Sequence, residues 1–255
     1  MSGATGFMPL LLGWWWLALV VFLRVGAMMA VLPGLGEQTV PMRVRLALGL
    51  VLTVTVLPAT GAYLALPPPG LGTVAWALVT ESVIGLILGL WLRLFMHALQ
   101  TAGSIAAQST SLAQLLGNSA ADPMPAIGHV LTVAALALLM STGFHVKIAG
   151  FIILSFELFP ALLLPDPSLI AQAGRGHIAM AFALAFTLAA PFVILSALYN
   201  LTLGFINKAM PQLMVAFVGA PVITFGSIAL LLVTAPLMLS LWIASVDRFL
   251  SGQTP

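Results

Sequence analysis

Long apolar runs separated by short polar segments dominate the pattern of this chain. A helix that crosses a membrane needs about 20 mostly apolar residues. Six stretches have this length, and a seventh, 148–164, is short enough to be a half-span or an interfacial helix. The six are 9–33, 44–66, 73–99, 127–146, 177–199 and 213–246. The pattern therefore predicts an all-α membrane protein with about six apolar helical segments.

Prolines lie inside several of these stretches, at positions 58, 191, 221 and 236. A proline removes a backbone donor and crowds the preceding turn. In lipid, the backbone group that this frees must be satisfied by neighbouring protein or by water. We therefore expect a packed assembly of bent helices, with the last stretch broken by Pro221 and Pro236 into unequal helices.

Four of the connections between the apolar stretches are informative. Residues 33–45 form a polar turn with two arginines, 65–72 are stiff and uncharged, and 165–176 are expected to form a loop. The longest weakly apolar segment, 100–126, is rich in Ser, Ala and Gln. Non-helical backbone at membrane depth must lie inside protein or along a water-filled path. This segment is therefore either a loop that plugs a pore or an ordinary amphipathic connection at the interface.

Composition narrows the class of protein further. Hydrophobic residues make up 62% of the chain and charged residues only 5%, against roughly 25% charged in soluble domains. Aqueous enzymes, nucleic-acid binders and disordered proteins are therefore excluded. The chain has no cysteine, and its four histidines show no metal-ligand spacing. No nucleotide-binding or hydrolase motif occurs, so we expect no enzymatic activity, no metal and no cofactor.

The first apolar run is expected to be retained as a span. No Lys or Arg precedes it, so the basic region of a signal peptide is missing. Its three tryptophans, Trp14 to Trp16, are expected near one membrane interface. With the N-terminus outside, the inside loops would hold four basic residues and the outside segments three. This count favours that orientation only slightly. The inside residues would be Arg43, Arg45, Arg93 and Lys208.

Two charged residues interrupt apolar stretches. An acid within a span is costly unless it is paired or hydrated, so Glu81 is a candidate for either a proton relay or a hydrogen bond to a neighbouring helix or subunit. The hydrogen bond is the favoured interpretation. Arg24 either reaches an interface or pairs with an acid, and we expect that acid to lie across a subunit boundary. Glu157 and Asp166 flank the half-span and are expected to be solvated.

Gly85 and Gly89 form a GxxxG in the third apolar stretch, which allows another backbone to approach closely. We interpret this motif as a packing site.

Three blocks of sequence occur one after another along the chain. The first, RVGAMMAVLPGLGEQTVPMRVRLALG, carries Arg24, Pro33, Pro41, Arg43 and Arg45. The second, TAGSIAAQ, carries Gly103 and is followed by Asp122 and Pro123. The third, NKAMPQLMVAFVGAP, carries Lys208, Pro211, Gln212, Gly219 and Pro221. In this order and spacing the blocks resemble the FliR family, the R-type subunit of the flagellar export gate, over about residues 14–246. The T subunit of injectisomes is its relative.

The resemblance implies a function that composition alone does not. Such a chain would join P-type and Q-type subunits in a gate of the bacterial inner membrane, at the flagellar basal body, with B-type and A-type export subunits as further partners. Unfolded export substrates would pass through its centre. The apolar segments would then be bent helical hairpins in a hetero-oligomeric shell. Residues 1–255 would form a single membrane-embedded domain that binds no nucleic acid.

The resemblance also favours the plug interpretation of the weakly apolar segment. The residues concerned are Gln108, Ser109, Thr110, Ser111, Leu112, Leu115 and Leu116. The family usually has glycine and aromatic residues after the glutamine, so a plug here would be built from hydroxyls and leucines. Pro211 would set a tight turn between the fifth and sixth apolar stretches, with Lys208 on a wet or inter-subunit surface.

Two alternatives remain open. One is an injectisome T subunit, which would differ in partners and substrates. The other is a proton-coupled secondary transporter that uses Glu81 near mid-membrane.

Overall fold

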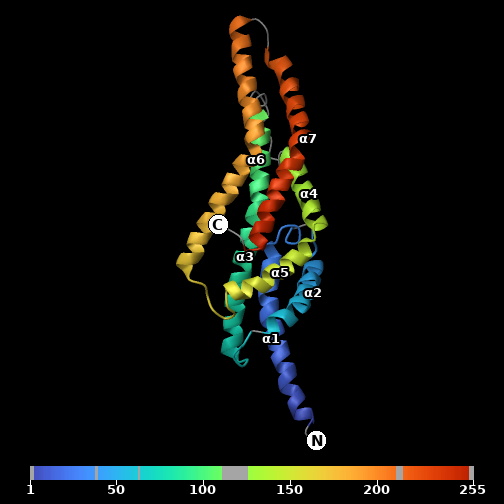
Figure 1. Cartoon of the computed structure of the whole chain (residues 1–255), viewed down its shortest axis with the longest axis vertical. Coiled ribbons are helices and arrows are strands. Elements are labelled where there is room, and N and C mark those ends of the chain that lie inside the picture. Colours follow the sequence, from blue (N-terminus) through green and yellow to red (C-terminus); the bar gives the residue numbers. More distant parts are fainter. Residues whose placement is uncertain (1–2, 38–39, 63, 111–125, 211–214, 253–255) are drawn as a thin grey trace. The chain divides into compact units, whose positions relative to one another are not determined.

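The computed structural model describes residues 3–37, 40–62, 64–110, 126–210 and 215–252. Within these ranges the regular secondary structure is all helical, as the sequence predicts (Figure 1). The helices are α1 (Gly3–Val31), α2 (Met42–Gly61), α3 (Leu71–Thr110), α4 (Ala126–Ser141), α5 (Phe144–Leu158), α6 (Pro167–Ala209) and α7 (Val215–Leu250). Among the described residues, five helices are long and apolar enough to cross a membrane, and α4 with α5 would make a sixth as one bent span.

The described helices form two compact units. Unit 1 comprises Met1–Leu94, Met140–Gly176 and Val246–Pro255, and unit 2 comprises Phe95–Leu139 and His177–Ser245. Helices α3, α6 and α7 each contribute a segment to both units. The expectation of one domain over residues 1–255 stays a prediction.

Unit 1 is built on close packing of α1 against α3. A Cβ added at Gly85 would meet the carbonyl oxygen of Arg24, and one at Gly89 would lie 2.9 Å from the carbonyl oxygen of Met28. Side chains of ordinary size would therefore force the two backbones apart. The GxxxG prediction is confirmed, and its partner is α1.

An apolar cluster extends this packing along the same two helices. Trp16 and Val20 of α1 pack with Ala77 of α3, and the Trp16 indole N–H donates to the carbonyl of Pro67 at 3.0 Å. Helix α2 packs against α1 and α5. Trp14 and Trp15 are exposed, whereas Trp16 is buried. The place of the three tryptophans near a membrane interface stays a prediction.

Unit 2 repeats the use of glycine at a crossing. A Cβ at Gly103 of α3 would collide with the backbone of Gly128 in α4. The buried Trp242 of α7 donates its indole N–H to the carbonyl of Phe95 at 2.8 Å. The part of α3 that lies in unit 2 is therefore held by α4 and by α7.

Three expectations about helix boundaries are wrong. The expected loop 165–176 is helical from Pro167, because Asp166 caps α6 by accepting from the Ser168 N–H at 2.8 Å and proline suits the first helical position. Hydrogen bonding by Ser168 also lowers the pKa of the exposed Asp166 carboxyl. Helix α3 continues to Thr110, eleven residues past the expected end at 99. The junction after the fourth stretch lies at Gly143, whose φ of 74° ends the preceding helix.

The expected break in the last stretch is also wrong, because α7 runs through both Pro221 and Pro236. Pro58 and Pro191 likewise lie inside α2 and α6. A proline kept inside a helix frees one carbonyl, whereas a full break frees up to four N–H and four carbonyl groups. In apolar surroundings the continuous helix is therefore the less costly solution.

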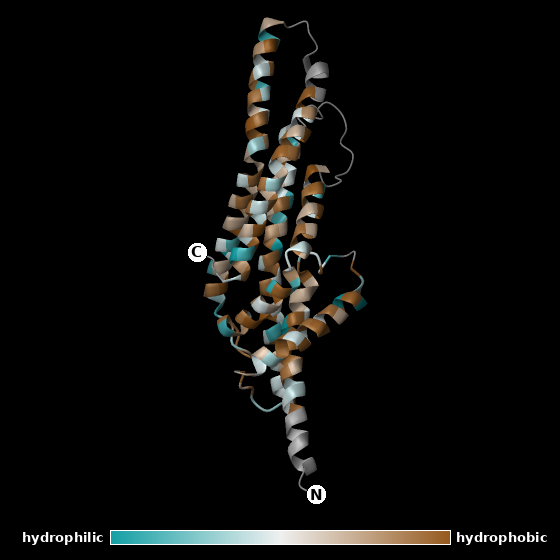
Figure 2. Cartoon of the chain, turned by 45° about the vertical axis from the view of Figure 1, so that its right-hand side comes forward, coloured by the Kyte–Doolittle hydropathy of each residue, from teal (hydrophilic) through white to brown (hydrophobic). Residues whose placement is uncertain are grey.

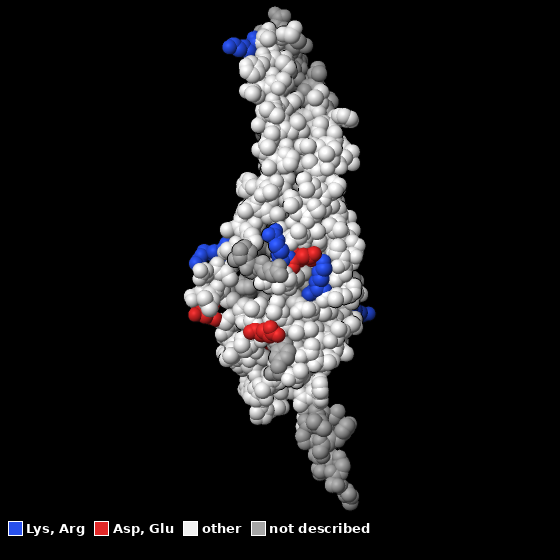
Figure 3. All heavy atoms as spheres, viewed as in Figure 1, with Lys and Arg blue, Asp and Glu red and all other residues white. Residues whose placement is uncertain are grey.

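Hydrophobic residues predominate along the helices (Figure 2). Many of their side chains are exposed on the long helices of each unit. On α7, Phe225 is 75%, Leu232 74% and Val233 78% exposed, and Phe186 of α6 is 62% exposed. The face drawn in Figure 3 carries few charged side chains. Surfaces of this kind require lipid or other subunits as neighbours.

Candidate functional site

A buried ion pair lies inside unit 1, in helices that are otherwise apolar. Arg24 of α1 and Glu81 of α3 are both 0% exposed, and the Arg24 Nε donates to Glu81 Oε2 at 2.7 Å. A single charge buried in this way would carry an uncompensated desolvation penalty. In contact, each group compensates the charge of the other.

The remaining donors of Arg24 cap the C-terminal end of α5. Its Nη1 donates to the Ser155 carbonyl at 2.9 Å and to the Ser155 hydroxyl at 3.2 Å, and its Nη2 donates to the Phe159 carbonyl at 2.9 Å. The guanidinium carbon lies 3.7 Å from the centroid of the Phe156 ring. Carbonyls at a helix end carry negative partial charge, and the Ser155 carbonyl accepts from Arg24 in addition to the Phe159 N–H. Arg24 therefore joins α5 to α1 and α3.

The second oxygen of Glu81 holds the connection that follows α5. Its Oε1 accepts from the Leu162 N–H at 2.8 Å, and the Trp76 indole N–H donates to the Leu162 carbonyl at 2.9 Å. Leu162 has a φ of 63°, a left-handed conformation that is rare for leucine. Such strain costs about 1–3 kcal/mol and persists only where the surroundings impose it. Here Glu81, Trp76 and the apolar cluster around Trp16 impose it.

The geometry resolves the two interpretations of Glu81. Both of its carboxylate oxygens accept hydrogen bonds from groups on other segments of the same chain, and its side chain has no contact with solvent. The favoured interpretation, a hydrogen bond to a neighbouring helix, is confirmed. The expectation that Arg24 pairs across a subunit boundary is wrong, because α1 and α3 already bring Arg24 against Glu81. Glu157 and Asp166 are exposed, as expected.

Sequence reasoning identified both charges but did not pair them with each other. One arginine in the first apolar stretch and one acid in the third were a sufficient signal for that pairing. It also missed Ser155, Phe159 and Leu162. Phe159 and Leu162 take part through backbone groups, which leave no trace in the residue type, and Ser155 contributes its hydroxyl as well as its carbonyl.

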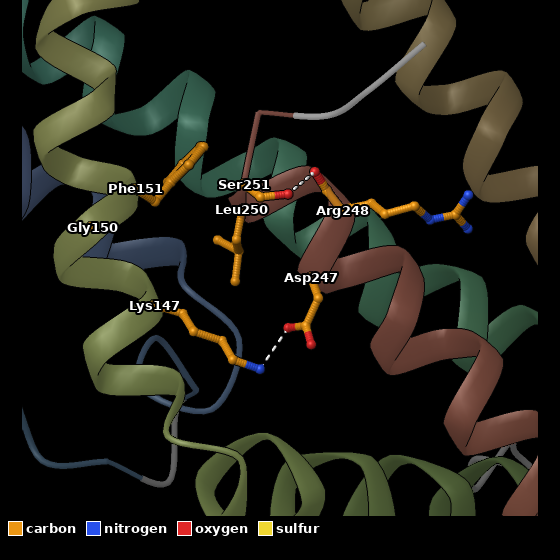
Figure 4. A pocket seen from close by; sticks show the side chains of 7 residues that line it. All are labelled: Lys147, Gly150, Phe151, Asp247, Arg248, Leu250 and Ser251. Carbon is orange, nitrogen blue, oxygen red and sulfur yellow. Dashed lines mark hydrogen bonds and ion pairs between the residues drawn. The ribbon is translucent and has the colours of Figure 1, made fainter.

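A second candidate is a cavity of about 440 Å³ in unit 1 (Figure 4), where α5 meets the end of α7. It is lined by Lys147, Gly150, Phe151, Asp247, Arg248, Leu250 and Ser251. Lys147 and Asp247 point toward one another and form an ion pair of 2.7 Å, while the Arg248 side chain points away. Its charged groups therefore do not converge on a ligand, and the cavity is weaker as a functional site than the buried pair.

We predict that Asp247→Asn changes the free energy of unfolding by less than about 1 kcal/mol, since ion pairs at exposed positions contribute little. Lys147 and Asp247 are 31% and 43% exposed. Thermal unfolding in detergent, with the exposed Glu157→Gln as control, measures the change. A loss several times larger than that of the control would contradict this assignment.

The residues expected to plug a pore begin in the last turn of α3. Gln108 is exposed, Ser109 is half-buried and Thr110 ends the helix. The other members lie outside the described residues: Ser111, Leu112, Leu115 and Leu116.

The family-motif residues occupy several environments. Arg24, Pro33 and Gly103 are buried, Arg45 is half-buried, and Pro41, Arg43 and Lys208 are exposed. Arg43 and Arg45 lie in α2, and the Arg45 Nη2 donates back to the Glu37 carbonyl at 2.9 Å, which closes the preceding turn. Gly219 and Pro221 lie in α7, where only their backbone is described. Asp122, Pro123, Pro211 and Gln212 lie outside the described residues.

Metal binding finds no support in the part of the chain that the structure describes. No group of three or more His, Cys, Asp or Glu side chains there could hold an ion.

Comparison with known proteins identifies the family. Residues 15–249 match the family described as bacterial export proteins, family 1. The flagellar biosynthetic protein FliR of Caulobacter vibrioides is 32% identical over 236 residues, which cover 92% of this chain and 93% of that protein. The FliR proteins of Escherichia coli and Bacillus subtilis are each 28% identical, with 85% and 84% of this chain and 83% and 84% of theirs covered. The chain therefore belongs to family 1 of the bacterial export proteins.

Proposed function

We propose that the chain is a subunit of the flagellar type III protein export gate. In this role it helps to form and close the inner-membrane pore through which unfolded flagellar proteins pass. The family match over residues 15–249 carries the proposal, and relatives named flagellar biosynthetic protein FliR, similar over most of both chains, support it. The role is that of a scaffold, and none of the residues that hold the buried pair is assigned a reaction.

The proposed setting is the bacterial inner membrane at the flagellar basal body. Exposed apolar faces on α6 and α7 need partners, and we assign these to lipid and to P-type and Q-type gate subunits in a hetero-oligomeric shell. The B-type and A-type export subunits are proposed as further contacts. Gln108 to Leu116 are proposed as the pore plug. The family-motif residues from Arg24 to Pro221 are proposed to act in packing and assembly.

A proton-coupled transporter is the weaker candidate. It would require Glu81 to release and take up a proton in contact with water. Glu81 is instead fully buried, with Arg24 on one oxygen and the Leu162 N–H on the other. An injectisome T subunit would share the fold and differ in partners, and the relatives named above favour the flagellar assignment.

Deletion of the gene tests the proposal. We expect the deletion strain to secrete no flagellin and to be non-motile, with both restored by the wild-type gene. A deletion strain that builds filaments and swims would overturn the flagellar assignment.

The turn that the sequence predicts at Pro211, outside the described residues, gives a more local prediction. Pro211 sets φ in the turn, and Gly219 follows it in the family motif, so replacing both by leucine is expected to prevent gate assembly and abolish motility. The control is Gly174→Leu, since a Cβ at Gly174 meets no atom within 4 Å. A swimming assay and the amount of assembled gate are measured together. Normal assembly and normal export by the double variant would refute this role of the turn.

A further inference from the structure

The last turn of α3 in unit 2 is tied to α6 by a partly buried hydrogen bond. A helix leaves its last four carbonyls without intrahelical partners. One of them, the carbonyl of Ser109, accepts a hydrogen bond from the Ser196 hydroxyl of α6. Ser196 is 5% exposed. A side chain from a neighbouring helix therefore acts as the cap for this end of α3.

A second residue of α6 supports this cap. Asn200 Nδ2 donates to Ser196 Oγ at 3.3 Å, and the two residues are four positions apart, on the same helical face. A serine hydroxyl can donate one hydrogen bond, and Ser196 donates its hydrogen bond to the Ser109 carbonyl. Its oxygen then accepts from Asn200, so the three groups form one directed chain from Asn200 through Ser196 to Ser109.

The position of Ser196 on α6 makes this contact specific. The other buried residues described on this helix are Ala185, Leu188, Ala189 and Phe192, which are all apolar. Apolar contacts tolerate sliding, whereas a hydrogen bond requires both partners at a fixed distance and angle. A shift of one turn, about 5.4 Å, would leave the Ser109 carbonyl without this donor. Gly103, six residues before Ser109, also contacts α4 at Gly128. This is a van der Waals contact, which does not require the fixed distance and angle of a hydrogen bond.

We propose that Ser196, supported by Asn200, is a positioning residue that fixes the register of the last turn of α3 against α6. It thereby fixes the position of the exposed Gln108 side chain, which directly precedes Ser109. Its consequence for export rests on the proposed function, in which Gln108 belongs to the pore plug. The register itself does not rest on that function.

Hydrogen exchange on the full chain, assembled with its gate subunits in detergent, tests the register directly. Ser196→Ala is expected to speed exchange in the last turn of α3 about fivefold, which corresponds to the roughly 1 kcal/mol that a typical intramolecular hydrogen bond contributes. Ser196→Thr keeps the hydroxyl and is expected to restore slow exchange. Asn200→Ala is expected to give an exchange rate between those of the wild type and Ser196→Ala. The matched control is Thr187→Ala, because Thr187 is exposed on the same helix and its hydroxyl donates to Ala183 within that helix.

The outcomes separate the inference from the proposed function. Unchanged exchange in Ser196→Ala overturns the inference, and so does an increase that Thr187→Ala reproduces or that spreads over all of unit 2. The second readout is leak of a small solute into cells that carry the assembled gate. Faster exchange with increased leak, both reversed by Ser196→Thr, supports the whole proposal. Faster exchange without leak supports the register and contradicts the assignment of Gln108 to the plug.

Discussion

Replacing Arg24 by methionine is expected to destabilise the chain by about 3–5 kcal/mol, because it leaves Glu81 as a buried charge without a partner. It also removes the donors that cap the Ser155 and Phe159 carbonyls. A loss of this size is a large part of the stability of a typical protein. We therefore expect little of the variant in the membrane, a lower Tm in detergent and no motility. The matched control is Arg175→Met, since Arg175 is exposed on α6.

A double variant separates the charge from the hydrogen bonds. Arg24→Met with Glu81→Leu removes both charges, and replacing a whole buried pair by apolar residues is often tolerated. The recovery is expected to be partial, because the Leu162 N–H and the carbonyls of α5 then lack the partners that hold them here. If Arg24→Met were as stable as Arg175→Met, the assignment of the pair as a structural lock would be wrong.

The second large effect is expected at Gly85. Leucine at this position would place its Cβ against the carbonyl oxygen of Arg24 and within about 3 Å of the Ala27 side chain, so α1 must move away from α3. That movement would also pull Arg24 from Glu81, which lies one helical turn from Gly85 on α3. We expect a loss of several kcal/mol, more than the 1–3 kcal/mol usual for overpacking, and a non-motile strain.

Gly150 provides the control for Gly85. It lies in α5, with no atom within 4 Å of an added Cβ. Gly150→Ala is expected to stabilise α5 by about 0.5–1 kcal/mol through helix propensity alone. Thermal unfolding of both variants in detergent measures the contrast. A Gly85→Leu protein that unfolds at the wild-type temperature would show that the close approach of α1 and α3 is not essential.

The sequence predicts the helices well and their ends less well. Apolar runs identify each of the five described helices that are long enough to cross a membrane, because that length is set by lipid. Their ends depend on local capping, as at Asp166 and Pro167, where a segment that reads as a loop begins α6 instead. Prolines mislead for a physical reason, since the single carbonyl freed by each proline in α7 costs less than a broken helix in apolar surroundings.

The site was predictable in part. Arg24, Glu81 and the glycine pair stand out because charge and close-packing motifs are rare inside apolar helices. The groups that complete the site do not stand out. The carbonyls of Ser155 and Phe159 and the amide of Leu162 belong to every residue type, and only the fold brings them to Arg24 and Glu81. The polar cap at Ser196 was hidden for the same reason, because its acceptor is a backbone carbonyl.

The most direct test of the gate assignment is native mass spectrometry of this chain, tagged and co-expressed with the proposed P-type and Q-type subunits and extracted in mild detergent. The account predicts one copy of the chain held together with several copies of each partner. A stable particle of this chain alone, with no mass added when the partners are present, would contradict the assignment.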